Sequence, residues 1–234
     1  MLLTLAMTVA AHQSEHTPPS GTIGLIRLPS LFGESVCDHF QPRSVQLFSQ
    51  ANTKSRMGQI RVTKPWTFPK EGGCSGLEVR VQLVEPDSDQ DFPTLEYAYE
   101  EPAGIVLAKS GRWCQIQLRT RTAWIHEECE PGFMPIERVL RDKALYLVKG
   151  AAQLARSEPG GASTKLSQAL LEAQPAYATL VGTDKVKGVV WIHVAASQVG
   201  VCDREPLPHE IQTFWIPLRD TQGALQVWFH SRGC

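Results

Sequence analysis

The sequence predicts an all-β protein of small barrels or sandwiches with one short helix. Most segments with a regular hydrophobic pattern alternate between apolar and polar residues, as a strand with one buried face does. These segments are short, and turns that contain glycine or proline separate them. The best helix candidate is residues 164–174, with Ser163 or Thr164 as its predicted N-cap. Many short strands with frequent turns are typical of barrels and sandwiches.

Strands are predicted where alternation or a continuous apolar run is clearest, at residues 77–83, 113–118, 189–194 and 225–229. In the second of these segments, Cys114 and Ile116 lie on one face and Trp113 lies on the other. We therefore expect Cys114 and Ile116 to face a core and Trp113 to point outward. Trp124 and Trp215 are expected to fill barrel cores, because burying a tryptophan removes up to about 250 Å² from water.

The composition indicates a folded protein. The chain has 234 residues, of which 42% are apolar and 20% are charged, and its formal net charge is −1. This apolar content suffices for a core, and the modest charge speaks against a disordered chain. The chain has no general positive field and no polybasic tail, so neither nucleic acid nor a charged membrane surface is an expected partner.

Residues 1–11 are predicted to be a signal peptide. The apolar run from Leu2 to Val9 is shorter than the about 20 residues that a membrane span needs. Val9 and Ala11 fit the small-residue rule for cleavage before His12. No basic residue precedes the run, so the alternatives are a start further upstream or a buried strand of the mature protein. With no second long apolar run, we expect no membrane span and a periplasmic or secreted location.

The chain has six cysteines, and an oxidising compartment would pair them. Six cysteines allow 15 pairings, and their order favours three local bridges: Cys37 with Cys74, Cys114 with Cys129, and Cys202 with Cys234. A closed loop of about 15 residues, as in the second bridge, contributes roughly 3 kcal/mol. No Cys-x-x-Cys pair occurs, and no metal or other cofactor is expected.

An internal repeat runs through the chain. Residues 97–104 and 154–161 share the form apolar-Ala-x-x-Glu-Pro-small-Gly, and a fainter copy begins at Leu47. The two clear copies precede pairs of tryptophan-containing segments, at Trp113 and Trp124 and at Trp191 and Trp215. The spacing between the paired tryptophans grows from 11 residues in the first pair to 24 in the second.

These segments resemble the bacterial SH3-like domains, whose rough pattern is Gly-x-Trp-x-x-Val followed by Gly-Trp-Val. Residues 111–116 (Gly-Arg-Trp-Cys-Gln-Ile) match the first motif, and residues 123–125 (Ala-Trp-Ile) match the second with alanine in place of glycine. The resemblance covers about 45–229. It implies five-stranded, half-open barrels of roughly 60 residues, a size at which a domain is only marginally stable. It also implies ligand-binding or targeting roles at the bacterial cell envelope, usually without catalysis.

The repeat and the resemblance together divide the chain. After the signal peptide, we expect a degenerate SH3-like module at 22–93, an SH3-like module at 94–145, and an SH3-like module with an insertion at 146–234. The stretch 141–149 is expected to be a linker that proteases can reach.

Three aromatic residues are candidates for ligand binding. Tyr97, Tyr99 and Trp113 lie near the first turn and the middle strand, where the resemblance places a peptide groove. Flat rings there would hold an extended peptide or the face of a sugar. Nearby acidic residues favour a cationic partner: Glu100, Glu101, Glu127 and Glu128. The sequence places His126 in a solvated turn and His193 in a strand, rather than either in a metal site.

The sequence therefore predicts a non-catalytic, exported binding protein of the cell envelope that recognises peptide, peptidoglycan or a partner protein. A cell-wall hydrolase of the Cys/His type is the alternative, although no cysteine opens a helical pattern as its nucleophile would. A purely structural assembly factor is a third possibility, which the sequence does not separate from the first.

Overall fold

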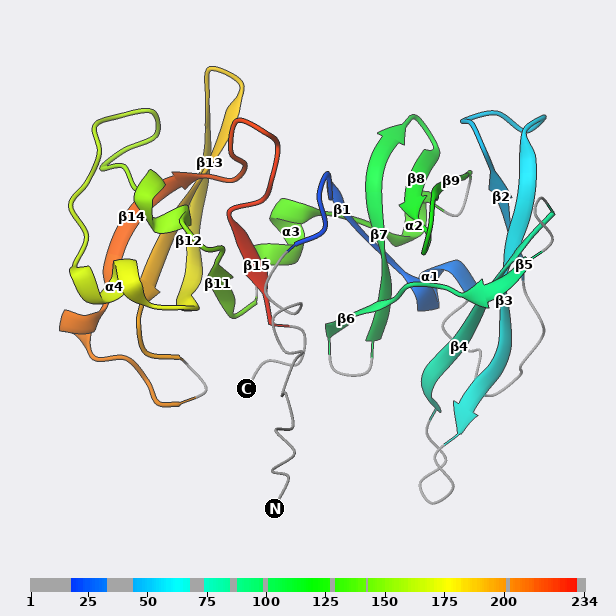
Figure 1. Cartoon of the computed structure of the whole chain (residues 1–234), viewed down its shortest axis with the longest axis horizontal. Helices are drawn as coiled ribbons and strands as arrows, with labels where there is room; N and C mark the ends of the chain where they lie inside the picture. The colour runs from blue at the N-terminus through cyan, green and yellow to red at the C-terminus, as the bar shows by residue number, and fades with distance from the viewer. Residues whose placement is uncertain are drawn as a thin grey trace, which may run out of the picture.

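The computed structural model describes residues 18–32, 44–67, 74–84, 88–98, 101–126, 129–141, 143–200 and 203–230. This part of the chain folds into fifteen β-strands in two antiparallel sheets, with four α-helices of four to six residues. The prediction of an all-β fold is confirmed, although the helices are more numerous than the single one expected. Figure 1 shows the two sheets side by side.

The larger sheet contains β1 (Gly24–Arg27), β2 (Ser44–Phe48), β3 (Arg56–Thr67), β4 (Cys74–Leu83), β5 (Ser88–Asp91), β6 (Leu95–Ala98), β7 (Glu101–Ser110), β8 (Trp113–Gln117), β9 (Thr122–Ile125) and β10 (Phe133–Pro135). The smaller sheet contains β11 (Leu145–Leu147), β12 (Ala176–Val186), β13 (Val189–Ser197), β14 (Gln212–Pro217) and β15 (Val227–Phe229). The helices are α1 (Leu28–Phe32), α2 (Cys129–Gly132), α3 (Ile136–Arg141) and α4 (Gln168–Glu172).

Two sets of five strands have the same order. The first is β10-β1-β7-β8-β9, within the larger sheet, and the second is β15-β11-β12-β13-β14, which is the whole smaller sheet. In each set, three consecutive strands form a meander next to the opening strand, and the last strand pairs with the opening strand on its other side. We call them the first and second five-stranded units.

Tight hairpins at equivalent places reinforce this correspondence. β7 and β8 are joined through Gly111, and β12 and β13 are joined through Gly188. Both glycines have positive φ, 57° and 83°. Two-residue hairpins require this left-handed backbone, which glycine adopts without steric cost. The second and third strands of both units therefore meet in two-residue turns, with the glycine first in one turn and second in the other.

The two units differ in the connection that follows the opening strand. In the first unit this connection, residues 28–100, carries β2 to β6; β2 joins the sheet beyond β9 through the pair of Phe48 and Trp124. In the second unit the connection, residues 148–175, carries α4 and the short 3-10 turn η1 (Ala151–Leu154). β1 thus shares a unit with strands that lie beyond the predicted boundary at residue 93. The module limits drawn from the sequence stay predictions.

The repeated Glu-Pro motif does not occupy equivalent places. Residues 101–104 of the first copy begin β7, whereas the second copy lies in the connection after β11. There Arg156 exchanges backbone hydrogen bonds with Trp215 and covers part of the edge of β14. The tryptophan-containing segments, by contrast, do fall on equivalent strands, the third and fourth of each unit.

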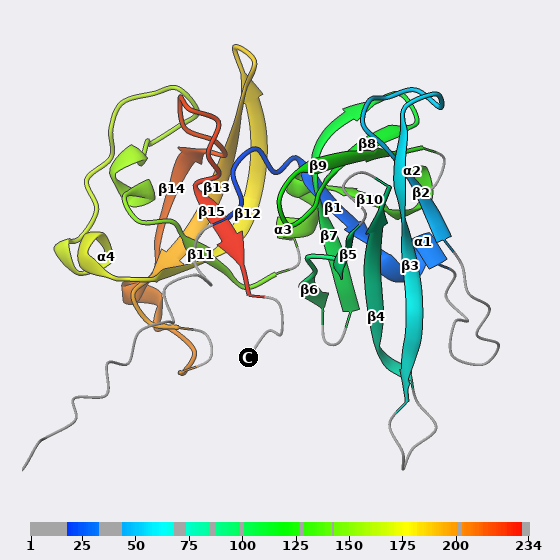
Figure 2. The same cartoon turned by 45° about the vertical axis from the view of Figure 1, so that its right-hand side comes forward.

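A shared core joins the two units. β1 is buried on both faces: Ile26 packs with the core of the first unit, and Leu25 packs with the core of the second. The α3 residues Val139 and Leu140 also belong to the second core, and Figures 1 and 2 show α3 between the two sheets. The Arg219 guanidinium adds a hydrogen bond to a backbone carbonyl of the segment before β1. The units are therefore packed directly on each other.

The linker expected at 141–149 is a strand instead. β11 occupies its middle, and Leu145, Tyr146 and Leu147 are each at most 5% exposed. The apolar run of residues 144–148 explains the difference, because a strand buried on both faces shows no alternation. We therefore withdraw the expectation of easy proteolysis at this segment.

The helix expected at 164–174 is shorter. α4 begins at Gln168, because the Ser167 side chain accepts a hydrogen bond from the Leu170 N–H and caps the first turn. The Ser167 N–H donates to the Gln212 side chain at 2.9 Å, which ties the extended segment before the helix to β14. The cap is therefore three to four residues later than the sequence suggested.

Candidate functional site

Trp113 lies on the outer face of β8, as predicted. Cys114 and Ile116 are fully buried on the opposite face, while Trp113 is half-buried. The Trp113 ring packs edge-on against Phe48, with centroids 5.2 Å apart, and lies over His126 at 4.2 Å. Phe48 and His126 therefore restrict the orientation of the Trp113 ring.

Tyr97 lies in a different environment. It is on β6, where its ring packs edge-on against Phe229 at 6.4 Å, and the Lys143 ammonium lies 4.3 Å above the ring centroid. Tyr97 therefore packs beside the core that joins the two units. Tyr99, the third predicted residue, is outside the described residues.

The structure does not bring Tyr97 and Trp113 together. β6 pairs with the first residues of β7, whereas Trp113 pairs with Ser110 at the end of β7. At about 3.3 Å per residue, the two ends of this strand lie on the order of 30 Å apart. A single groove lined by both rings is therefore not formed.

The prediction that Trp124 and Trp215 fill the barrel cores is wrong. Both are half-buried. The buried residues of the fourth strands are their neighbours, Ala123 and Ile125 in β9 and Phe214 and Ile216 in β14. The alternation of a strand decides this arrangement: the smaller residues on both sides face inward, so the tryptophan between them faces outward.

Aromatic residues gather on the outer side of the third and fourth strands of each unit, and in the first unit the buried Phe48 of β2 packs against them. We call Phe48, Trp113, Trp124 and His126 the first aromatic face, and Trp191, His193 and Trp215 the second aromatic face. In the second face, His193 stacks on Trp215 with centroids 4.8 Å apart and planes 8° apart. Gln115 pairs with Trp124 in the first unit just as His193 pairs with Trp215 in the second. The sequence analysis did not include Phe48, His126 or His193 among the candidate binding residues. His193 could have been found, because it is two positions from Trp191 and therefore lies on the same face of β13.

A disulfide lies inside the first unit. Cys114 of β8 and Cys129 of α2 are bonded and fully buried, which is the second of the three predicted pairs. Neither sulfur is a free thiolate in this structure. Cys37, Cys202 and Cys234 lie outside the described residues, and of Cys74 only the backbone is described. The other two pairs therefore stay predictions.

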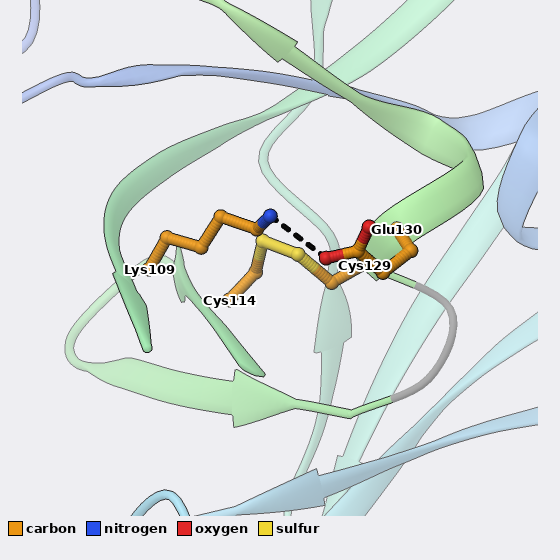
Figure 3. Close-up of a disulfide and its surroundings, with 4 residues drawn as sticks. All are labelled: Lys109, Cys114, Cys129 and Glu130. Carbon is orange, nitrogen blue, oxygen red and sulfur yellow. Dashed lines mark hydrogen bonds and ion pairs between the residues drawn. A yellow bond between two sulfur atoms is a disulfide. The ribbon is translucent and has the colours of Figure 1, made fainter. Parts of the chain in front are cut away.

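An ion pair sits beside this disulfide (Figure 3). The Lys109 ammonium of β7 donates to the Glu130 carboxylate of α2 at 2.8 Å. This hydrogen bond, with the charge of Lys109, lowers the pKa of Glu130 below its usual range. The disulfide and the ion pair thus fasten the same helix to neighbouring strands β8 and β7.

A pocket of about 660 Å³ opens at one end of the second unit. Residues of α4, the start of β12 and the loop after β13 line it: Ala169, Glu172, Ala173, Gln174, Pro175, Tyr177, Gln198, Val199 and Asp203. The loop passes close to Tyr177, since a Cβ added to Gly200 would lie 2.9 Å from the Tyr177 ring. A smaller pocket, of about 410 Å³, lies between β3 and β4.

An ion pair between Arg204 and Glu210 lies within the loop after β13, and it lowers the pKa of the Glu210 carboxyl. Arg204 donates to both Glu210 carboxylate oxygens, at 2.8 and 2.6 Å, and the Leu207 N–H donates a third hydrogen bond at 2.8 Å. These bonds, that of Arg204 first, lower the pKa of Glu210 to about 2. Because folding lowers this pKa, the pair stabilises the fold above the usual value of 4.5 and loses that effect as the pH falls toward 2.

We expect an NMR titration of the Glu210 carboxyl to give this low pKa. In Arg204→Met the pKa should rise toward 4.5, because the first of its causes is removed. A pKa that stays low in Arg204→Met would show that the backbone contact from Leu207 dominates instead.

Within the described residues, no group of three or more His, Cys, Asp or Glu side chains is arranged to hold a metal ion. The helices described are all too short or too polar to cross a membrane. Comparison with protein-family models, curated proteins and solved structures finds no match to this chain.

Proposed function

We propose that this chain is a non-catalytic, exported binding protein of the bacterial cell envelope, built from SH3-like modules, that recognises a peptide, peptidoglycan or a partner protein. The observation that carries the proposal is the pair of aromatic faces. Each contains half-buried tryptophan rings on the third and fourth strands of a five-stranded unit, and each includes a histidine packed on a tryptophan.

The strand connectivity supports the modular part of the proposal. In each unit the last strand returns to pair with the opening strand, while the fourth strand does not pair with the fifth. A fifth strand that returns to the first supports a relation to the five-stranded barrels that the sequence resemblance implies.

The aromatic faces support the binding part of the proposal. Tryptophan offers a large, rigid contact area that loses little conformational entropy on binding, and its ring stacks on a sugar or packs against an extended peptide. The neighbouring rings of Phe48 and His126 hold Trp113 in place, which reduces the entropy lost on binding. The disulfide is compatible with an exported protein, because such bonds persist in oxidising compartments.

Retention on purified peptidoglycan and on envelope extract tests the proposal. We expect Trp113→Ala and Trp215→Ala each to reduce retention at least tenfold while the protein stays folded. Val84→Ala is the control, because it removes a side chain that is 61% exposed and belongs to neither face. Circular dichroism reports whether each variant is folded. Unchanged retention in both tryptophan variants would contradict a binding role for the faces.

A further inference from the structure

The smaller pocket opens on the outer side of the larger sheet, the side that carries the first aromatic face. Its polar lining residues are Arg56 and Gln59 of β3 and Gln82 of β4. Ile60 and Val81, which are neighbours of the two glutamines, are fully buried and belong to the same core cluster as the buried residues of β9. Because side chains alternate along a strand, the glutamines point away from that core.

Backbone pairing connects this pocket to the first aromatic face. Phe48 of β2 pairs with Trp124 of β9 on one side and with Arg56 of β3 on the other. The side chains of directly paired residues lie on the same face of a sheet. Since neighbouring strands are about 4.8 Å apart, the backbone of Arg56 lies on the order of 10 Å from that of Trp124. Trp124, Phe48 and Arg56 therefore form a line across three strands.

A β-bulge gives Arg56 its place in this line. Leu47 pairs with Gly58 and Phe48 pairs with Arg56, so Met57 is the extra residue of β3. A bulge changes the direction of the side chains next to it. β3 and β4 also approach closely here, since a Cβ added to Gly58 would lie 2.3 Å from the carbonyl oxygen of β4 that it faces. The backbone therefore forms part of the wall of the pocket.

The pocket presents hydrogen-bond donors. The Gln59 side-chain nitrogen donates to the Gln82 side-chain oxygen at 3.0 Å. This bond occupies the Gln82 oxygen, and the Gln82 amide nitrogen remains a donor with two N–H groups. The Arg56 guanidinium adds up to five N–H groups and a positive charge. Such a set of donors favours a carboxylate, which only accepts hydrogen bonds and which arginine can bind through both oxygens.

The charge at the pocket is positive. Of the described lining residues, Arg56 is the only charged one, and it takes part in none of the ion pairs of the described chain. The carboxylates of the neighbouring strand β5, Asp89 and Asp91, are both bonded to Arg80, at 3.2 and 2.6 Å. Arg56 is thus available to a negatively charged ligand.

We infer that the first aromatic face and this pocket together bind the C-terminal end of an extended peptide. The terminal carboxylate binds Arg56 and the Gln82 amide, and an apolar side chain close to the end of the peptide packs on Trp124. At about 3.3 Å per residue, an extended chain covers the distance between these contacts in three residues. The inference rests on the proposed function, since it names the ligand of one aromatic face.

The test uses the full chain and three short peptides. The probes are acetyl-Phe-Gly-Ala with a free carboxylate, the same peptide as its C-terminal amide, and acetyl-Ala-Gly-Ala with a free carboxylate. We expect the first peptide to shift the NMR signals of the Trp124 indole and the Gln82 side-chain amide, and to bind at least tenfold more tightly than either of the others. Equal binding of the acid and amide forms, or no binding of the acid form at millimolar concentration, would overturn the inference.

An acidic sugar tests whether the ligand is a peptide. Glucuronate carries a carboxylate and a sugar ring, but it lacks the spacing of the tripeptide. We expect it to bind at least tenfold more weakly than acetyl-Phe-Gly-Ala. If glucuronate bound as tightly, the pocket would accept any carboxylate, and the assignment to a peptide end would be wrong.

One substitution identifies the contact with the carboxylate. Arg56→Gln should weaken binding of the acid form of acetyl-Phe-Gly-Ala at least tenfold and leave binding of the amide form unchanged. The matched control is Arg119→Gln, which removes an exposed arginine from the turn between β8 and β9. Circular dichroism reports whether both variants are folded. Equal weakening in the two variants would mean that only the general charge of the unit attracts the peptide, and would also overturn the inference.

Retention on peptidoglycan separates this inference from the proposed function. If Trp113→Ala loses retention while the unmodified protein binds the acid and amide tripeptides equally, the peptide inference is wrong and the proposed function stands. If Trp113→Ala and Trp215→Ala both keep retention on peptidoglycan and envelope extract while the tripeptide binds through Arg56, the proposed role of the aromatic faces at the envelope is wrong and the peptide site stands.

Discussion

Phe214→Ala is expected to lower the free energy of unfolding by about 3–5 kcal/mol, the range for truncating a buried aromatic residue. Phe214 is 1% exposed and belongs to the core that joins the two units. Trp215→Ala, at the next position, is expected to cost much less, because Trp215 is half-buried on the outer face and retains contact with water. Urea unfolding of the two variants measures this difference.

This pair of neighbours tests the orientation of β14. If Trp215→Ala were as destabilising as Phe214→Ala, Trp215 would belong to the core and the second aromatic face would not be open to a ligand. Ile125→Ala and Trp124→Ala give the same comparison in the first unit, since Ile125 is fully buried and Trp124 is half-buried.

Replacing both Cys114 and Cys129 by alanine is expected to lower the free energy of unfolding by roughly 3 kcal/mol. The bond closes a loop of 15 residues, and removing it restores the entropy of that loop to the unfolded chain. The double variant avoids the unpaired buried thiol that either single variant would leave. Chemical unfolding under non-reducing conditions measures the change.

The pKa of the Glu130 carboxyl provides a second measurement on the variant that lacks both cysteines. Without the disulfide, α2 is held to β7 and β8 by fewer contacts, and the ion pair with Lys109 should loosen. The pKa of Glu130 should then rise toward its usual value. A double variant with unchanged stability and an unchanged Glu130 pKa would show that packing alone fixes α2.

Alternation predicted the strands that have one buried face. In β4, Val79, Val81 and Leu83 are buried, and in β8, Cys114 and Ile116 are buried, as the pattern of their sequences indicates. The same alternation places Trp124 outward, between the buried Ala123 and Ile125, although tryptophan is large and apolar. The parity of a strand position decides its direction before the size of the side chain does.

Strands buried on both faces were not predicted as such. β1 is short, with Leu25 and Ile26 facing two different cores, so its sequence shows no alternation. β11 lies in the segment predicted to be a linker, and its residues are likewise buried on both faces. These two opening strands set the order of each unit, and their pairing partners lie far along the chain. Local patterns carry no information about such distant pairing.

The candidate sites also combine features that one strand determines with features that depend on contacts between distant segments. The outward direction of Trp113 follows from its own strand, and it was predicted. The separation of Tyr97 from Trp113 depends on the length of β7 and on where β6 pairs with it. The pocket between α4 and the loop after β13 depends on contacts between segments about 30 residues apart, which neither segment reveals alone.

The shared core between the units fixes the spacing and the relative direction of the two aromatic faces. Two binding surfaces on a flexible tether adapt to many spacings, with the effective concentration set by the tether. Two surfaces on one rigid body keep a fixed spacing instead. A polymeric ligand whose repeat length matches this spacing would contact both faces at once, and it would bind with an avidity that a single repeat lacks.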